Sequence, residues 1–391
     1  MMDFDDIRPW VVRCVRCGTC KYTNETYLPS CPAGERFRFE PFYASGKNFI
    51  ARGIIEGALK FSDPGVVEAI YSCPTCGNCQ NQCPLPHHEH LVDIYEAMRA
   101  RAVEEGAGPL PAHKPLLASL RQYDNPWMQP RASKVRWAKE LGIKDISKEK
   151  ARVLYFVGCT AALDPTLRNI PTATATLLKS AGVDFGILGE AEICCASTTL
   201  RIGDRKLFKN LAERNIELLN RIKVETIVTS CAGCFKTLKH DYKSIGKIKP
   251  QILHSSEFIY RLFLGGKLKF KKEANQVVTY HDPCHLGRLG GVFDPPRRIL
   301  RYLPGITFRE MDRIRENAYC CGAGGGVRTA FPDWATDNVG TRIEEAEKTG
   351  ARLLVSTCPF CAQNFMTGIE KKGSSLEYVD LVDLLNRLIR E

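Results

Sequence analysis

Ten of the chain's 18 cysteines form a five-membered pattern that occurs twice. Matching members lie at a nearly constant separation, 125 residues from Cys159 to Cys284 (284 minus 159) and 127 from Cys231 to Cys358 (358 minus 231). This register indicates an internal duplication in which each half builds the same thiolate cage. Thiolates in such numbers bind soft metals, above all iron with sulfide, so each cage predicts an iron–sulfur site. The first set is Cys159, Cys194, Cys195, Cys231 and Cys234, and the second is Cys284, Cys320, Cys321, Cys358 and Cys361.

The remaining eight cysteines lie in two runs near the start of the chain. The run from Cys73 to Cys83 has the spacing C-x2-C-x2-C-x3-C and precedes Pro84, which is the pattern of bacterial ferredoxins. Three of its thiolates wrap one [4Fe–4S] cube, and the fourth reaches the other cluster. The upstream run has ten residues, 21–30, before its fourth cysteine, so an insertion enlarges that loop. This crossover rule assigns Cys14, Cys17, Cys20 and Cys83 to one cubane cluster, and Cys31, Cys73, Cys76 and Cys79 to the other.

Disulfides and zinc are the main alternatives for so many cysteines. Disulfide frameworks belong to small secreted domains, whereas this chain has 391 residues and an acidic N-terminus, MMDFDDIRPW, without a signal peptide's apolar core. Zinc takes four ligands, and a five-cysteine set with two adjacent members exceeds that number. The sequence therefore favours iron–sulfur clusters at all 18 cysteines.

The charge and hydropathy of the chain limit its partners. The net charge is +11, from 55 basic and 44 acidic residues, and residues 267–272 (KLKFKK) form a basic tract between the repeats. No segment combines clustered arginines with stacking aromatics, so we expect no nucleic-acid binding; a basic surface suits an acidic protein partner or an anionic substrate. No apolar run approaches the roughly 18–20 residues that span a bilayer. We therefore expect a cytoplasmic protein, with any membrane association arising through a partner subunit.

The pattern of the chain divides it into a helical part and a duplicated part. Residues 1–105 have helical periodicity around the cysteine loops, with HHEH at 87–90 expected to be the solvated start of a helix. Residues 106–150 contain five prolines and are expected to form an ordered linker. Two α/β domains, 151–270 and 271–391, are expected to follow. The predicted fold is thus α+β and multidomain, with an N-terminal helical two-cluster ferredoxin domain.

Strands and helices alternate in both of the later domains. In the first domain, two segments are predicted to be buried strands that each lead to a cysteine of the first set, residues 152–157 (RVLYFV) and 225–229 (ETIVT). In the second domain, two further predicted strands each lead to a cysteine of the second set, residues 276–280 and 352–356 (RLLVS). This alternation predicts parallel sheets covered by helices. Sites in such sheets lie beyond the carboxyl ends of the strands, where these cysteines fall.

The combined motifs resemble the heterodisulfide reductase family. Within it, the arrangement looks like the D subunit, a fusion of the ferredoxin-like C subunit with the catalytic B subunit, which carries two cysteine-rich (CCG) domains. The phrases HDPCHLGR at 281–288 and CCGAGGG at 320–326 are common in that family. Glycolate oxidase iron–sulfur subunits share much of the arrangement.

The resemblance implies a reaction and its cofactors. Each five-cysteine set would hold a noncubane [4Fe–4S] cluster, and a disulfide would be reduced or formed between the two. The two cubane [4Fe–4S] clusters would supply the electrons. His281 and His285 flank Cys284 and would either donate hydrogen bonds or protons at the cluster or serve an ordinary packing role.

Two departures from the family pattern leave an alternative open. The first set reads Cys-Cys-Ala at Ala196 where the family has Cys-Cys-Gly, and alanine resists backbone shapes that glycine permits. The long gap from Cys20 to Cys31 also differs from the methanogen D subunit. The alternative is an electron-transfer subunit without its own substrate, as in class II benzoyl-CoA reductase-type complexes. Because the chain has no flavin or nucleotide motif, its electron donor would be a flavoprotein or other subunit, or a membrane cytochrome; an open pocket between the five-cysteine sets would favour the enzyme.

Overall fold

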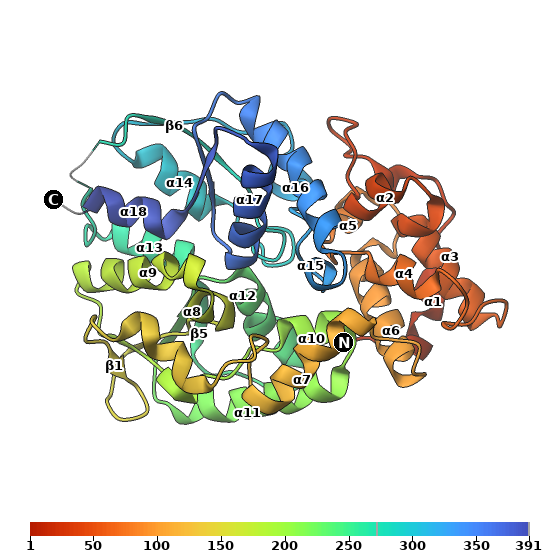
Figure 1. The fold of residues 1–391 in the computed structure, drawn as a ribbon, viewed down its shortest axis with the longest axis horizontal. Helices are drawn as coiled ribbons and strands as arrows, with labels where there is room; N and C mark the ends of the chain where they lie inside the picture. Colours follow the sequence, from red (N-terminus) through yellow and green to blue (C-terminus); the bar gives the residue numbers. More distant parts are fainter. Residues whose placement is uncertain (271–272, 390–391) are drawn as a thin grey trace.

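The computed structural model describes residues 1–270 and 273–389, so Lys271 and Lys272 of the basic tract lie outside the described residues. The helical N-terminal part lies at one end of the molecule, and the two α/β parts lie beside each other at the other end (Figure 1). No described helix is both long enough and apolar enough to cross a bilayer. The expected fold class, helices followed by duplicated α/β units, is confirmed.

The N-terminal part consists of short helices that alternate with cysteine loops. Helix α6 buries Leu91, Ile94, Tyr95 and Met98, the spacing of one face of an α-helix. Cys31 is the N-cap of helix α2, and its Sγ accepts the backbone N–H of Gly34. The helices are α1 (Arg8–Val11), α2 (Pro32–Phe37), α3 (Ala44–Ile55), α4 (Val66–Tyr71), α5 (Asn78–Gln82) and α6 (Leu91–Glu104).

The first sheet has the strand order β1-β3-β2-β4-β5, and all of its pairs are parallel. Strand β1 comes from residues 106–150 and pairs Lys144 with Gly186; a Cβ at Gly186 would lie 2.7 Å from Ile146 Cγ1. We therefore propose that this segment is both linker and sheet edge. The strands are β1 (Lys144–Asp145), β2 (Val153–Tyr155), β3 (Phe185–Ile187), β4 (Thr226–Thr229) and β5 (Gln251–His254); the helices are α7 (Lys114–Tyr123), α8 (Cys159–Leu163), α9 (Asn169–Ser180), α10 (Ser197–Ile202), α11 (Arg205–Arg221), α12 (Ala232–Lys239) and α13 (Ser255–Leu264).

The second sheet repeats the topology of the first in the order β7-β6-β8-β9, again all parallel. Strands β6 and β8 occupy the places of β2 and β4, as the sequence repeat predicts. The strands are β6 (Gln276–Tyr280), β7 (Ile306–Phe308), β8 (Leu353–Ser356) and β9 (Glu377–Asp380); the helices are α14 (Asp294–Tyr302), α15 (Val327–Ala330), α16 (Pro332–Glu347), α17 (Pro359–Lys372) and α18 (Leu381–Ile389).

The duplication extends to individual hydrogen bonds. The Tyr155 hydroxyl lies 2.8 Å from Ser230 Oγ in the first half, and the Tyr280 hydroxyl lies 3.1 Å from Thr357 Oγ1 in the second. All four side chains are buried. The halves also pack on each other, with α9 against α18 and α13 against α14. The related sheets therefore place their cysteine loops within one continuous interior.

Candidate functional site

The eight N-terminal cysteines line two separate cavities. Ala44 at the start of α3 borders both. One cavity is lined by Cys14, Cys17, Cys20 and Cys83, and the other by Cys31, Cys73, Cys76 and Cys79. The tertiary structure thus brings together the same two groups of four cysteines that the crossover rule predicts. The assignment of each group to a cluster stays a prediction.

The donor set of these cavities fits a metal cluster. Burial raises the pKa of the Cys20 thiol to about 11 and that of Cys31 to about 12, although Lys47 acts in the opposite direction on Cys31. Such thiols lose their protons when a metal takes their place. The buried Lys47 lines the second cavity and donates to the Phe42 carbonyl, so its charge faces the thiols. Thiolates carrying an anionic iron–sulfur cluster would be stabilised by that cation.

His87 is a neighbour of the first cavity that the sequence interpretation missed. Its Nε2 lies 3.9 Å from Cys83 Sγ, and its side chain is 1% exposed. Burial lowers the pKa of His87, which keeps the ring neutral. The expected solvated helix start holds for the 3-10 turn at His88–His90 but is wrong for His87. The four-residue spacing between Cys83 and His87, close to one helical turn, is the sequence feature that could have indicated their proximity.

The first five-cysteine set lines one cavity at the carboxyl end of the first sheet. Cys159 begins α8 shortly after β2, and Cys231 is the N-cap of α12 after β4. Cys358 has the equivalent N-cap position at α17 after β8. A helix N-terminus carries partial positive charge and favours thiolates. The cavity is lined by Cys159, Cys194, Cys195, Cys231 and Cys234.

A buried ion pair supports this first set. Lys134 Nζ donates to the Glu192 carbonyl at 2.9 Å and lies 3.6 Å from Glu192 Oε1. The Glu192 carboxylate accepts the N–H groups of Val157 and Gly158, directly before Cys159. Burial alone would lower the pKa of Lys134, but Cys159 and Glu192 raise it above its ordinary value. Lys134 comes from the expected linker, which is why no motif marked it.

The Cys-Cys-Ala departure keeps the backbone of the first set in the left-handed region. Ala196 has φ +62°, and the equivalent Gly322 has φ +89°. The Ala196 N–H lies 3.4 Å from Cys194 Sγ, as the Gly322 N–H does from Cys320 Sγ. Alanine therefore adopts the left-handed shape that glycine takes elsewhere, with a strain of about 1–2 kcal/mol.

The second five-cysteine set has a histidine on each side. Cys321 Sγ lies 3.6 Å from Cys361 Sγ, and one ring nitrogen of His281 lies within 4.8 Å of both. His285 Nδ1 lies 3.3 Å from Cys284 Sγ. The set is completed by Cys320 and Cys358.

Two buried arginines orient these histidines. Arg201 Nε donates to His285 Nε2 at 3.4 Å, and Arg342 Nε donates to His281 Nδ1 at 3.2 Å. Because a guanidinium only donates, the ring nitrogen that it meets must accept. The ring N–H is then on the other nitrogen, which in His285 faces Cys284. Each histidine can therefore direct a hydrogen-bond donor toward a sulfur.

Arg201 also joins the site to the N-terminal part. It is 2% exposed, and it forms ion pairs with Glu96 of α6 at 3.1 Å and with Asp241 at 2.7 Å. A buried arginine with two carboxylate partners is held in one orientation. The position of His285 thus depends on contacts from three separate regions of the chain.

Thiols from different cysteine groups lie near one another. The neighbouring Cys320 thiol lowers the pKa of Cys76 to about 7. The neighbouring Cys231 thiol lowers the pKa of Cys358 well below its ordinary value. The second N-terminal cavity thus lies near the second five-cysteine set, and that set lies near the first.

Two arginines hold the N-terminal cysteine loop beside the second set. Arg288 Nε donates to the Cys76 carbonyl at 3.0 Å. Arg99 Nη1 donates to the Gly325 carbonyl at 2.8 Å, and its Nη2 donates to the Cys73 carbonyl. The N-terminal cysteine loop is therefore bound directly to the glycine loop that follows Cys320 and Cys321.

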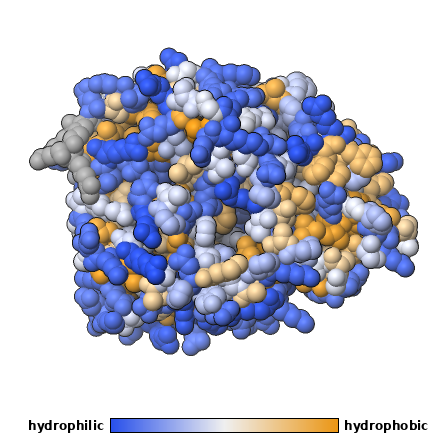
Figure 2. Space-filling view, viewed as in Figure 1, coloured by the Kyte–Doolittle hydropathy of each residue, from blue (hydrophilic) through white to orange (hydrophobic). Residues whose placement is uncertain are grey.

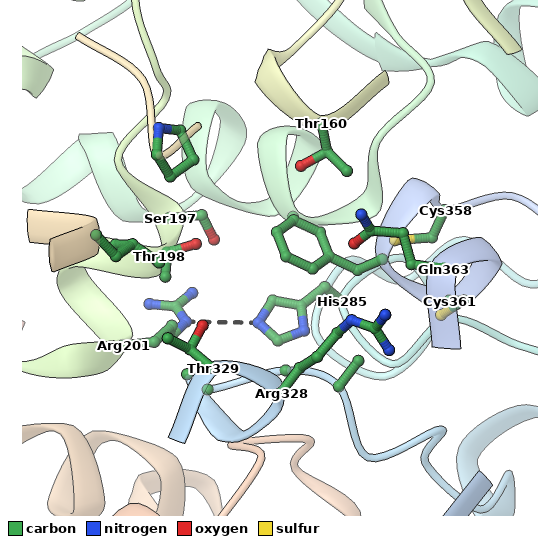
Figure 3. A pocket seen from close by; sticks show the side chains of 18 of the residues that line it. Thr160, Ser197, Thr198, Arg201, His285, Arg328, Thr329, Cys358, Cys361 and Gln363 are labelled. Carbon is green, nitrogen blue, oxygen red and sulfur yellow. Dashed lines mark hydrogen bonds between the residues drawn. The ribbon is translucent and has the colours of Figure 1, made fainter. Parts of the chain in front are cut away.

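A cavity of about 610 Å³ lies between the two α/β halves. Four cysteines of the second set line it, and Thr160, Ser197 and Thr198 line it from the first half. The first-set cavity borders the same three residues, so the two spaces adjoin. Figure 3 shows Arg201, His285, Arg328 and Gln363 around the space, with the Arg201–His285 hydrogen bond drawn. Apolar side chains, Leu116, Trp127, Met128 and Phe360, complete the lining.

Arg328 differs from Arg201 in this cavity. Its Nη1 donates to Asn364 Oδ1 at 2.7 Å and its Nη2 to Thr367 Oγ1 at 3.3 Å. Within residues 1–270 and 273–389 it has no carboxylate partner in ion-pair contact. The Arg328 charge is thus available to a ligand, whereas that of Arg201 is already neutralised.

Comparison with known proteins agrees with this architecture. The profile of a 4Fe-4S dicluster domain matches residues 10–86, and that of a cysteine-rich domain matches 153–239 and 278–366. The chain is 35% identical over 387 residues to the D subunit of dihydromethanophenazine:CoB–CoM heterodisulfide reductase from Methanosarcina mazei, covering 95% of this chain and 92% of that relative. The Methanosarcina barkeri protein of the same name is 34% identical over the same shares. The chain belongs to the family of heterodisulfide reductase D subunits.

Membership in the D-subunit family confirms the resemblance seen in the motifs. The chain is an iron–sulfur oxidoreductase subunit with a 4Fe-4S dicluster domain and duplicated cysteine-rich domains. A more distant relative is the probable iron-sulfur-binding oxidoreductase FadF of Bacillus subtilis, which is 33% identical over 392 residues. That match covers 96% of this chain and 52% of the relative. The D-subunit arrangement therefore also occurs as part of longer proteins.

Proposed function

We propose that this chain passes electrons from two cubane [4Fe–4S] clusters to two noncubane [4Fe–4S] clusters that reduce or form a disulfide. The observation that carries the proposal is the cavity of about 610 Å³, which meets the second five-cysteine set and adjoins the first. A subunit that only relayed electrons would need space there for the clusters alone, whereas Leu116, Trp127 and Met128, which are remote in sequence from these cysteines, also line the cavity. The pocket thus favours an enzyme with its own substrate.

The proposed ligands follow the cysteine groups. Bound clusters would supply the two electrons that cleave one S–S bond, with two protons completing two thiols. The chain's residues orient the disulfide so that one sulfur faces each five-cysteine set. The cubane ligands are Cys14, Cys17, Cys20 and Cys83, and Cys31, Cys73, Cys76 and Cys79; the noncubane ligands are Cys159, Cys194, Cys195, Cys231 and Cys234, and Cys284, Cys320, Cys321, Cys358 and Cys361.

The order of the cysteine groups supports a single route for electrons. Cys17 is exposed, whereas the five-cysteine sets are buried apart from the partly buried Cys284. Cys76 lies near Cys320, so the second N-terminal cavity neighbours the second set. Cys231 lies near Cys358, so the two five-cysteine sets are also neighbours. Electrons would enter near Cys17 and leave at the cavity, or follow the reverse path.

Polar residues of the cavity support a thiol or disulfide that carries an anionic group. Arg328, which forms no ion pair with another described residue, offers its positive charge to a carboxylate, sulfonate or phosphate. His285 and His281 would donate hydrogen bonds to the sulfurs of the second set. We propose an electron-donor subunit as the partner in a multisubunit complex, a flavoprotein or a membrane cytochrome being candidates.

Anaerobic iron and sulfide quantitation with EPR, during titration with an anionic thiol, tests this function. Four clusters correspond to about sixteen irons per chain. We expect about that number and an EPR signal that changes with the thiol. A Cys321→Ser variant should lose the thiol response and keep the cubane signals. About eight irons without a thiol response would instead indicate that only the N-terminal cubane sites bind clusters.

A further inference from the structure

Exposed apolar side chains gather around the first cysteine loop. Half of the ten large hydrophobic side chains that are exposed in the described residues lie between positions 12 and 39. Figure 2 shows apolar residues on the surface of this N-terminal part. We define the Cys17 face by these five side chains, Val12 (48% exposed), Val15 (67%), Tyr22 (49%), Tyr27 (80%) and Phe39 (63%).

The Cys17 face is held together by contacts between its segments. Tyr22 forms a bridge with Pro29 at the base of a short loop that carries Tyr27. Lys21 forms an ion pair with Glu40, which places the start of that loop beside Phe39. These contacts order the insertion at residues 21–30, which a minimal ferredoxin loop would lack. An ordered loop that exposes aromatic side chains is suited to contact another molecule.

Cys17 is the one exposed cysteine in the part of the chain that the structure describes. The other cysteines of its cavity, Cys14, Cys20 and Cys83, are partly or fully buried. A cluster held there would reach the surface at Cys17, between Val15 and the insertion. Cys17 lies at the opposite end of the proposed electron route from the central cavity. It is therefore suited to exchange electrons with a partner.

The rim of this face is positively charged. Arg13, Arg16 and Arg38 are exposed, and none forms an ion pair with another described residue. Arg13 stacks over the Trp10 ring at 4.9 Å, and Arg16 over the Phe49 ring at 4.2 Å. The rings position these guanidinium groups without neutralising them. Glu25 of the insertion is also exposed, but the three arginines outnumber it. A contact surface with an apolar centre and a mainly cationic rim complements an acidic partner.

We propose that the Cys17 face docks an acidic one-electron carrier protein or subunit. The carrier would place an apolar patch over Val15, Tyr27 and Phe39, with its carboxylates opposite Arg13, Arg16 and Arg38. In each encounter one electron passes from the reduced carrier to the cluster at Cys17, and the carrier leaves oxidised by one electron. The inference rests on the proposed function only for the presence of that cluster, and it takes the inward one of the two directions of electron flow.

Stopped-flow reduction of the cluster-loaded full chain tests the docking. The probe is a flavodoxin hydroquinone, which is an acidic one-electron donor, at increasing sodium chloride concentration. We expect the bimolecular rate constant to fall as salt screens the attraction. Phe39→Glu should lower it by about tenfold or more, since a carboxylate would repel the donor and remove apolar contact. Arg38→Glu should lower it and flatten its dependence on salt.

Matched controls separate docking from folding. Leu264→Glu introduces the same charge at a side chain of similar exposure, 64% against 63% for Phe39, on α13 and should leave the rate constant unchanged. Dithionite, a small reductant, should reduce all variants at the wild-type rate, which shows that their clusters are intact. The thiol-dependent EPR signal should persist in Phe39→Glu, so that failure of the docking and failure of the proposed function are distinguishable.

Other occupants of the face would overturn the proposal. A Phe39→Glu rate constant equal to that of the wild type would place docking elsewhere. Binding to vesicles containing phosphatidylglycerol that Phe39→Glu abolishes, with no change in flavodoxin kinetics, would assign the face to a membrane surface. A wild-type dimer that Phe39→Glu converts to monomer in sedimentation experiments would assign it to a second copy of the chain.

Discussion

The Nε–H of Arg342 donates a hydrogen bond to Nδ1 of His281, with 3.2 Å between the two nitrogens. His281 must accept at that nitrogen, so its Nε2 carries the hydrogen and faces the interior beside Cys321 and Cys361. The Nε2 atom is buried and has no hydrogen-bond partner among the described residues. A cluster sulfur would supply that partner. Arg201 holds His285 in the corresponding way at Cys284, so the second set has histidine donors on two sides.

We predict that His285→Leu lowers the reduction potential of the cluster in the second set. Hydrogen bonds to cluster sulfurs stabilise the more negative, reduced form, so removal of one donor disfavours reduction. EPR-monitored redox titration measures the shift. His285→Gln, whose amide can donate, should shift the potential less. An unchanged potential in His285→Leu would leave His285 with a packing role.

Replacement of Cys83 tests the crossover between the two N-terminal cavities. Cys83→Ala should disturb the cluster with Cys14, Cys17 and Cys20, although Cys83 is adjacent in sequence to the 73–79 run. Since one [4Fe–4S] cluster contains four irons, we expect a loss of up to about four irons per chain. EPR should show the signal of the other cubane unchanged. Loss of that second signal instead would show that Cys83 binds the cluster of its own run.

We predict that Ala196→Gly leaves the protein as stable as the wild type or stabilises it by about 1 kcal/mol. Relief of left-handed strain at φ +62° offsets the extra backbone entropy of glycine. Ala118→Gly, on the exposed side of α7, should instead destabilise by about 1 kcal/mol. Gly322→Ala should destabilise more, because its Cβ would lie 2.5 Å from Asn338 Nδ2. Anaerobic thermal unfolding compares the three; a clear loss of stability in Ala196→Gly would contradict the strain argument.

His113 predicts a loss of stability toward acid pH. Its Nε2–H donates to the Gly326 carbonyl at 2.9 Å, its side chain is fully buried, and burial lowers the pKa of His113 to about 4. In the unfolded chain His113 binds a proton near pH 6.5, whereas in the folded protein it binds one only near pH 4. The contribution of His113 is therefore present above pH 6.5 and falls as the pH decreases toward 4.

Denaturant unfolding between pH 7.5 and about 5 measures the contribution of His113 to the free energy of unfolding. His113→Gln keeps a donor for Gly326 and removes the titrating group, so its unfolding free energy should decline less steeply with acid. The difference between the two slopes isolates His113 from other groups. Parallel pH profiles for the two proteins would rule out the histidine as the cause.

Arg328→Gln should weaken binding of anionic thiols in the central cavity. Hydrogen bonds to charged groups contribute about 1.5–3 kcal/mol, which corresponds to an affinity loss of roughly tenfold to a hundredfold. The thiol-dependent EPR titration gives the affinity, with mercaptoethanesulfonate as the anionic ligand. Mercaptoethanol, its uncharged counterpart, should bind both proteins equally. Equal losses for both thiols would mean that Arg328 shapes the cavity without binding the anion.

Local patterns were sufficient for the fold class, and they predict groups of cysteines that the tertiary structure places around common cavities. Strand periodicity placed β2, β4, β6 and β8 within a residue or two at each end, because alternating strands and helices are encoded in short windows. The prolines of 106–150 suggested a linker, but β1 pairs with β3 across some forty residues. Such pairing depends on distant partners, which local composition does not reveal.

The sequence by itself determined the iron–sulfur character of this protein, its family and its duplicated parallel sheets, since ligand spacing and strand alternation are local properties. Only the tertiary structure decided that Cys76 lies near Cys320, that Cys231 lies near Cys358, and that a cavity lies between the halves. It also decided which charged side chains serve the site, namely Lys47, Lys134, Arg201, Arg328 and Arg342. Their roles arise from burial and from contacts between residues far apart in sequence, and such contacts leave no periodic signal in the chain.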